Sequence, residues 1–205
     1  MKKVLFLAAL LLVSFVGMAQ AQTSRKSKDE LKKQERKERR EERKVQDSIE
    51  NVISFDQAYQ ALKDKSFVME ADNLIFWNGV TRFVSPTTNF VALNNDQATV
   101  QFAFNNGYGG PNGIGGITVE GNASGIRMNT DKDGNVFFDM SVMGINISAS
   151  VTIVLTKDSN RASVTVNPNF TGNTMTFTGN LYPTALSNVY KANPNIFPNL
   201  LLPIR

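Results

Sequence analysis

The sequence predicts an all-β body, an antiparallel β-sandwich or barrel, preceded by a helical N-terminal region. Three observations support this fold class. Residues 98–104 (ATVQFAF) alternate apolar and polar side chains, the period-2 pattern of a strand with one buried face. After Lys65, turn-forming residues recur roughly every ten positions, as they do in sandwiches and barrels. No segment of helical periodicity separates the expected strands, which disfavours parallel βαβ units.

The expected strands are short and are bounded by clusters of Gly, Pro, Asn and Asp. They are rich in Val, Ile, Phe and Thr, which favour a pleated, half-buried surface. In chain order we place them at residues 67–72, 74–77, 80–84, 89–93, 98–104, 117–120, 125–128, 136–142, 147–155, 162–166 and 175–181. The first two are either separate strands or one strand with a break at Asn73. Together they define one β domain, which we assign to residues 51–205, with an extended apolar C-terminal tail.

A short helix is expected immediately before the strands. Ser54 followed by Gln57 is a capping-box pattern, which predicts that this helix begins at Ser54. Phe55, Tyr59 and Leu62 then share one helical face. We interpret this face as a packing surface that covers one end or face of the sheet.

Residues 22–50 form a charged segment without Pro or Gly. They include 11 basic and 8 acidic residues, a net charge of +3, whereas residues 51–205 include 9 basic and 10 acidic residues, a net charge of −1. Opposite charges at helical spacing, such as Glu35 and Arg39, favour a solvent-exposed helix, which we interpret as a stalk or linker. A basic arm for anionic partners is the alternative. The near-neutral β domain argues against nucleic-acid binding.

The first 21 residues have the pattern of a secretory signal peptide. Lys2 and Lys3 precede an apolar run over residues 4–16, and Ala19-Gln20-Ala21 supplies the small residues of a cleavage site. The run is too short to span a bilayer, which requires about 20 residues. We therefore expect a periplasmic or secreted product with no transmembrane segment after cleavage. The chain has no cysteine, so disulfides and lipid attachment through a cysteine are excluded.

Residues 105–125 (NNGYGGPNGIGGITVEGNASG) are rich in glycine and asparagine. A phosphate-binding loop would continue into a helix, and the commonest one carries a lysine; here the glycines lead into the strand-like Ile117-Thr118-Val119. The stretch is therefore either a turn-rich strand connection, with Gly113 and Gly116 at positive φ, or the edge of a ligand site. In the second interpretation the binding residues are Tyr108, Asn112, Gly113 and Gly116.

Several of these stretches resemble a family of exported bacterial domains of unknown function. The resemblance covers residues 55–190 and is carried by NFVAL, ATVQFAF, GPNGIGGITVEG, NRASVTVNP and GNLYP, most specifically by the region 101–121. The family occurs largely in Gram-negative anaerobes of gut and oral communities. The resemblance implies a location in the cell envelope and a compact β fold, and it supplies no catalytic residues.

The residue types present limit the possible chemistry. The sequence has no His and no Cys, which excludes the Ser-His-Asp triad, thiol nucleophiles, and zinc or copper sites built on nitrogen or sulfur ligands. Glu120 and Asp139 are the best candidates for a carboxylate pair, but strand alternation places both opposite the core. Asp131 and Asp133 weakly resemble a calcium loop, which we interpret as a hairpin turn. We expect no metal and no cofactor.

Two apolar features remain. The C-terminus from Tyr190 has three prolines, which exclude a regular helix, and is too apolar for a free tail, so we expect it to lie extended across the body; an interaction tail is the alternative. Trp77 lies in an apolar run and is expected in the core, although it could stack on a sugar.

Taken together, the sequence observations predict a non-catalytic envelope protein that binds a small molecule, a glycan or an envelope protein. The alternative is a carboxylate-based hydrolase acting on glycans.

Overall fold

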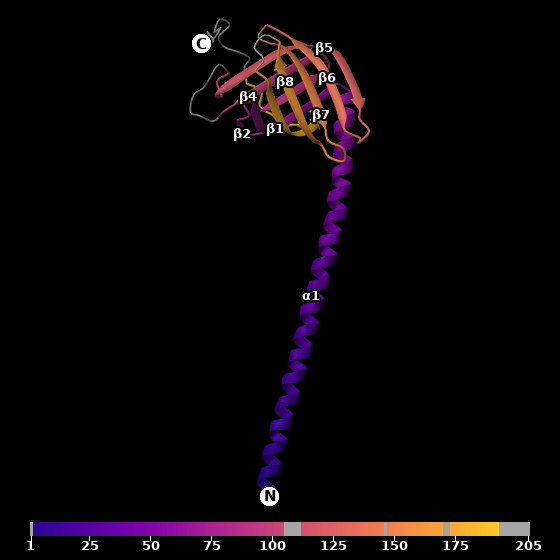
Figure 1. Cartoon of the computed structure of the whole chain (residues 1–205), viewed down its shortest axis with the longest axis vertical. Helices are drawn as coiled ribbons and strands as arrows, with labels where there is room; N and C mark the ends of the chain where they lie inside the picture. Colours follow the sequence, from indigo (N-terminus) through magenta and orange to yellow (C-terminus); the bar gives the residue numbers. More distant parts are fainter. Residues whose placement is uncertain (1, 105–111, 146, 170–172, 193–205) are drawn as a thin grey trace. The chain divides into compact units, whose positions relative to one another are not determined.

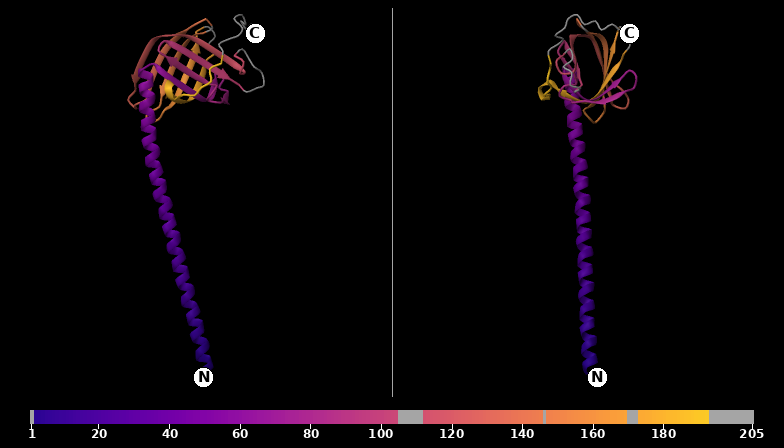
Figure 2. Two further views of the ribbon diagram at one scale, coloured as in Figure 1. Left: turned by 180° about the vertical axis from the view of Figure 1, so that it is seen from behind. Right: turned by 90° about the vertical axis from the view of Figure 1, so that its left-hand side faces the viewer.

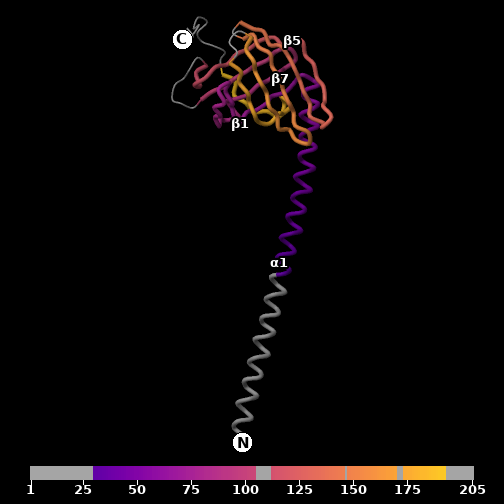
Figure 3. Tube along the Cα trace, viewed as in Figure 1, coloured from indigo at the N-terminus to yellow at the C-terminus, as the bar shows by residue number. Residues whose placement is uncertain are grey.

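The computed structural model describes residues 2–104, 112–145, 147–169 and 173–192, with the side chains described from residue 30 onward. The trace in Figure 3 is coloured over the residues described in full. The chain divides into two compact units, Met1–Ile49 and Glu50–Arg205. The first is wholly helical over its described residues, and the second contains the end of the same helix and all the described strands.

Helix α1 extends over Lys2–Lys63 without interruption. The prediction that a second helix begins at Ser54 is therefore wrong. The reason is that no Pro or Gly occurs between residues 18 and 63, so nothing ends the helix before Ser54 and its hydroxyl is not needed as a cap. The helix ends where Lys65 adopts a left-handed φ of 52°. Among the described residues, no helix is long and apolar enough to cross a membrane.

Eight antiparallel strands close into a barrel, which confirms the predicted all-β class and selects the barrel over the sandwich (Figure 1). Within the ring β1 pairs with β3, each strand from β3 to β8 pairs with the next along the chain, and β9 pairs with β1 to close the ring. A ninth strand, β2, pairs with β1 beside the ring. The strands are β1 (Ser66–Phe76), β2 (Thr81–Phe83), β3 (Phe90–Asn94), β4 (Gln97–Ala103), β5 (Gly116–Thr130), β6 (Val136–Met143), β7 (Ser148–Leu155), β8 (Arg161–Pro168) and β9 (Met175–Pro183).

Two long strands make the closure possible. β1 pairs along its length with β9, while on its other side its first half pairs with β3 and its second half with β2. β5 likewise changes partner, from β4 to β6, and bends between Ser124 and Arg127 where Gly125 has a φ of 62°. β5 was predicted as two short strands, which is wrong, whereas for β1 the alternative of one strand with a break at Asn73 is confirmed, since its register shifts between Ala71 and Asn73. Bulges bend a strand without ending it, and they leave the same polar, Gly-containing signature as a turn.

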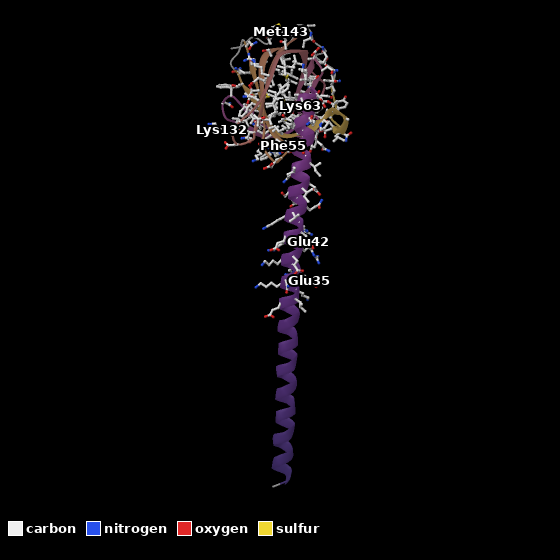
Figure 4. The ribbon with its side chains drawn as sticks, turned by 90° about the vertical axis from the view of Figure 1, so that its right-hand side faces the viewer. Glu35, Glu42, Phe55, Lys63, Lys132 and Met143 are labelled. Atoms are coloured by element: carbon white, nitrogen blue, oxygen red, sulfur yellow. The ribbon has the colours of Figure 1, made fainter. Side chains whose placement is uncertain are left out.

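The barrel interior is filled with apolar side chains from β1 and β3–β9. Phe67 and Phe138 meet edge to face, with 5.6 Å between ring centroids. The barrel has two different ends. We call the end where α1 leads into β1 the helix end, and the end with the β1–β2, β4–β5, β6–β7 and β8–β9 connections the loop end. Figure 4 shows Lys132 and Phe55 near the first and Met143 at the second.

The last turns of α1 complete the core at the helix end. Ala58, Ala61 and Leu62 are buried in the same apolar cluster as the strand residues, and Phe55 and Tyr59 pack at its margin. The predicted packing face of this helix is thus confirmed. Views from behind and from the side show the end of α1 against the barrel wall (Figure 2).

Candidate functional site

The loop end carries aromatic side chains that point into the barrel but are only half-buried. Phe76 ends β1, Phe102 lies in β4, and Phe104 follows it; all three pack at the margin of the interior cluster. The ring centroids of Phe76 and Phe104 are 5.9 Å apart, and those of Phe102 and Phe104 are 5.7 Å apart. We call these residues the aromatic trio. Their contact distances are those of favourable ring pairs, so the trio is a packed surface that still contacts water.

The β1–β2 hairpin at the same end exposes further aromatic groups. Trp77 is 65 % exposed and Phe83 is 89 % exposed. The expectation that Trp77 lies in the core is therefore wrong: β1 ends at Phe76, and Trp77 occupies the turn that the Gly79 N–H closes onto the Phe76 carbonyl oxygen (2.8 Å). The apolar run thus continues one residue past the buried part of the strand.

Met143, the last residue of β6, and Ile145, in the β6–β7 connection, are two more exposed apolar residues at the loop end. Both side chains are mostly accessible to solvent. Strand alternation places Met143 on the outside of the barrel, since Val142 points inward. Apolar side chains scattered singly over a surface are normal, but here they occur in two connections at one end of the barrel.

The glycine-rich connection between β4 and β5 also lies at the loop end, and it is described from Asn112 onward. Asn112 is buried, and its Oδ1 accepts hydrogen bonds from the N–H groups of Gly116 (2.9 Å) and Ile114 (3.1 Å). Its Nδ2 donates to Thr118 Oγ1 (3.2 Å). Asn112 therefore holds the turn together from inside, and its side chain is fully engaged.

The other predicted ligand residues of this stretch have different environments. Gly113 has a φ of 79° and open space around it, as expected for a turn glycine. The expected positive φ at Gly116 is wrong, since the left-handed residue is Gly115. Gly116 is required for close packing instead, because a Cβ there would lie 1.9 Å from the Phe102 carbonyl oxygen. Tyr108 lies outside the described residues.

The two candidate carboxylates do not converge. Glu120 forms an ion pair with Lys191, and Asp139 accepts a hydrogen bond from Thr152 Oγ1 (2.7 Å). Asp139 is paired across the β5–β6 ladder with Arg127, seven positions along β5 from Glu120. At the rise of an extended strand this separation is roughly 20 Å. A glycosidase pair needs its carboxyl groups within about 5–10 Å.

Asp131 and Asp72 both have pKa values lowered by hydrogen bonds from neighbouring residues. The pKa of Asp131 falls below its usual 3.8 chiefly because Asn135 hydrogen-bonds its carboxylate, and the N–H groups of Asp133 and Asn135 also donate to it. Asp131 thus caps a hairpin turn. The pKa of Asp72 is lowered mainly by its hydrogen bond from Arg161 (2.5 Å). No group of three acidic residues within the described ranges is arranged to hold a metal ion.

Sequence reasoning missed Gln101, one of the fully buried polar residues among those the structure describes. It is fully buried on the outside of β4, where residues 187–192 pass over it. The signal in the sequence was a long amide in an outward position between Val100 and Phe102. A pattern alone does not show that a later segment covers this position.

Residues 50–181 match a family model described as "Domain of unknown function (DUF4251)". The chain belongs to the DUF4251 family. The matched region begins in the last turns of α1 and ends in β9, so it contains the whole ring of strands. The expected membership in a family of unknown function is confirmed at this level.

A solved relative supports the same assignment. The crystal structure of a DUF4251 family protein from Bacteroides eggerthii DSM 20697, at 1.95 Å resolution, is 50 % identical to this chain. The match covers 69 % of this chain and 95 % of that chain, with a TM-score of 0.59. No curated protein matches the chain. The family name assigns no activity, so function has to be argued from the geometry.

Proposed function

We propose that this DUF4251 protein is an exported envelope protein that binds a ligand non-catalytically at the loop end of its barrel. The ligand presents a flat or apolar face to the aromatic trio and to Trp77. The signal-like residues 1–21 support export, and the aromatic surface supports binding.

The half-burial of the aromatic trio is the observation on which this proposal rests. Phe76, Phe102 and Phe104 point into the barrel like the core residues, yet retain contact with water that Phe67 and Phe138 at the other end have lost. Covering the remaining ring surface would contribute about 25 cal/mol per Å². A ligand that covers the three rings gains this free energy.

The hydrolase alternative has no comparable support in the arrangement of acids. Glu120 and Asp139 are engaged with Lys191 and Thr152 at distant points of the barrel surface. Neither is placed beside the aromatic trio by the strand register, in which Phe102 lies opposite Ile117. We therefore propose binding without catalysis.

The single tryptophan provides the test. Trp77 is the only indole in the chain, so its fluorescence reports on the loop end alone. We would titrate the protein with anilinonaphthalene sulfonate as an apolar probe and with an amino-sugar oligomer as a glycan probe. A saturable change with either probe supports the proposal and distinguishes the two ligand classes. No change with both, in a protein shown to be folded by circular dichroism, would contradict it.

A matched pair of variants locates the binding. Phe104→Ala and Phe55→Ala each remove a half-buried phenylalanine from the margin of the same apolar cluster, one at each end of the barrel. We expect Phe104→Ala to weaken probe binding several-fold and Phe55→Ala to leave it unchanged. Equal loss in both variants would show that the probe reports general loosening of the core.

Export is tested separately. Mass spectrometry of the protein from fractionated cells should give a mature N-terminus at Gln22 in the periplasm or the medium, because cleavage is expected after Ala21. A cytoplasmic product that retains Met1 would contradict the export proposal and leave the ligand-binding proposal standing.

A further inference from the structure

The outer surface of β3, β4 and β5 contains a row of side chains that are buried although they point away from the barrel interior. Phe90, Gln101 and Thr118 are consecutive cross-strand neighbours, at 2 %, 0 % and 0 % exposure. Outward positions of a barrel usually contact water. This row is therefore the floor of a covered site, which we call the outer groove.

Residues 187–192 cover the outer groove, and we call this segment the strap. The Tyr190 N–H donates to the Thr87 carbonyl oxygen (2.8 Å). Gln101 Nε2 donates to the Tyr190 carbonyl oxygen (2.8 Å), and Gln101 Oε1 accepts from the Ala192 N–H (2.9 Å). The side-chain amide of Gln101 thus bonds the backbone of two strap residues, i and i+2, as the peptide group of a neighbouring strand would.

The groove side of this contact is held in place independently of the strap. Gln101 Nε2 also donates to the Thr88 carbonyl oxygen (3.0 Å), and Gln101 Oε1 also accepts from Thr118 Oγ1 (2.9 Å). Thr118 Oγ1 in turn accepts from Asn112 Nδ2 (3.2 Å). The amide is therefore oriented for a peptide before the peptide arrives, which lowers the entropic cost of binding.

The strap is recognised mainly through its backbone, with two side-chain requirements. Ala192 is buried, so a small residue is needed at that position. Lys191 forms an ion pair with Glu120 at the rim; both side chains are partly exposed, so the pair contributes register more than affinity. At the other end of the strap, Ser187 Oγ donates to Glu70 Oε1 (2.7 Å).

The family match includes the residues of the outer groove but not the strap. The matched region 50–181 contains the groove residues Phe90, Gln101 and Thr118 and ends before Ser187. We propose that the outer groove is a binding site for an extended peptide segment with a basic residue followed by a small one, and that this chain fills it with its own strap. The site is distinct from the loop-end aromatic surface, so it does not depend on the proposed function.

The test cuts the strap free after the protein has folded. A protease recognition sequence is inserted between Ala185 and Leu186, in the exposed 3-10 turn Thr184–Leu186 that precedes the strap. The cut protein is passed over a size-exclusion column in mild denaturant, to remove the released C-terminal fragment, and is then returned to buffer. It is then titrated with a fluorescein-labelled peptide of residues 186–192. Uncut protein is the control, and it should not bind because its groove is occupied.

Variants of the labelled peptide test the mode of recognition without altering the fold of the protein. Replacing Ala192 by Pro removes the N–H group that donates to Gln101 Oε1, and should weaken binding roughly tenfold, because this buried oxygen loses one of its two hydrogen bonds. Replacing Lys191 by Ala should weaken it only a few-fold. On the protein side, Gln101→Leu should weaken binding, whereas Gln97→Leu should not: Gln97 points outward from the same strand but is exposed and bonds Asn122 instead.

The possible outcomes distinguish a strap that binds the groove as a ligand from a strap that is a required part of the fold. Retention of the cut fragment through the column, or saturable binding of the labelled peptide with the expected order of variants, supports the proposal. Loss of the fragment followed by no binding to a barrel with an unchanged circular dichroism spectrum overturns it. Unfolding of the barrel on cutting also overturns it, since the strap would then be part of the fold.

Discussion

The two ends of the barrel contain similar apolar side chains but bury them to different extents. At the helix end, Phe67, Leu62 and Leu155 are fully buried, because the last turns of α1 complete the core there. At the loop end, the aromatic trio keeps part of its surface in water, and Trp77 on the adjacent hairpin is mostly exposed. The helix end therefore supplies stability, while the loop end retains apolar surface that a ligand can cover.

The difference arises from what each end has available to cover it. The connections at the helix end are short turns, such as Asn94 to Gln97, and they leave room for the helix to pack against the interior. The loop end has the longest connection, between Ala103 of β4 and Gly116 of β5, and its Gly and Asn residues offer little apolar area for covering the core. Asn112 closes a turn in this connection, while Phe102 and Phe104 before it stay half-buried.

The largest expected difference between the ends is in stability. Phe67→Ala should lower the free energy of unfolding by about 3–5 kcal/mol, because it empties a fully buried site. Phe104→Ala should cost roughly half as much, since its ring is already partly hydrated. Urea denaturation followed by circular dichroism measures both.

Phe83→Ala is the control for this series, because Phe83 is almost fully exposed and should change the free energy of unfolding by less than about 0.5 kcal/mol. If Phe67→Ala does not fold, Phe67→Leu provides a milder truncation at the same site. Equal losses at Phe67 and Phe104 would show that the two ends do not differ in the way described.

An intermediate effect is expected within the glycine-rich connection. Asn112→Ala should destabilise the protein by about 1–3 kcal/mol, because the N–H groups of Ile114 and Gly116 lose their buried acceptor. Gly113→Ala should cost about 1 kcal/mol, from the left-handed backbone alone, since nothing lies near its Cβ position. Thermal unfolding of both variants checks the order. A larger loss for Gly113→Ala would contradict the role given to Asn112.

The smallest expected effect is on the pH dependence of stability, and it comes from the ion pair between Asp72 and Arg161. Arg161 holds the pKa of Asp72 below 3.8, so this ion pair stabilises the folded state above pH 3.8 and its contribution is lost as the pH falls through the lowered pKa. Both side chains are exposed, so the contribution should be below about 1 kcal/mol. Asp72→Asn should flatten the acid side of the stability curve slightly. A steeper acid dependence in that variant would reverse the sign we assign.

The fold was largely readable from local patterns, because strand alternation and turn residues are local properties. The pattern of residues 98–104 identified β4, and the shared face of Phe55, Tyr59 and Leu62 identified the packing side of the helix. Patterns failed where a long-range contact or a missing breaker decides the outcome. Ser54 carries a capping signature but lies within α1, since nothing before it ends the helix.

The candidate surfaces were harder to predict for the same physical reason. Trp77 was expected in the core because its neighbours are apolar, and only the position of the turn after Phe76 shows that it is exposed. Gln101 gave no sign of being buried, since the strap that covers it comes from 89 positions later in the chain. Such contacts depend on tertiary structure, which alternation and spacing do not contain.

The most direct test of the difference between the ends uses methionine methyl groups as probes. Met175 lies at the loop end, half-buried at the start of β9, while Met69 is fully buried in β1. In a protein labelled with ¹³C at the methionine methyls, anilinonaphthalene sulfonate should shift the Met175 resonance and leave Met69 in place. Shifts confined to Met69, or to Met128 near the helix end, would contradict the assignment of the binding surface to the loop end.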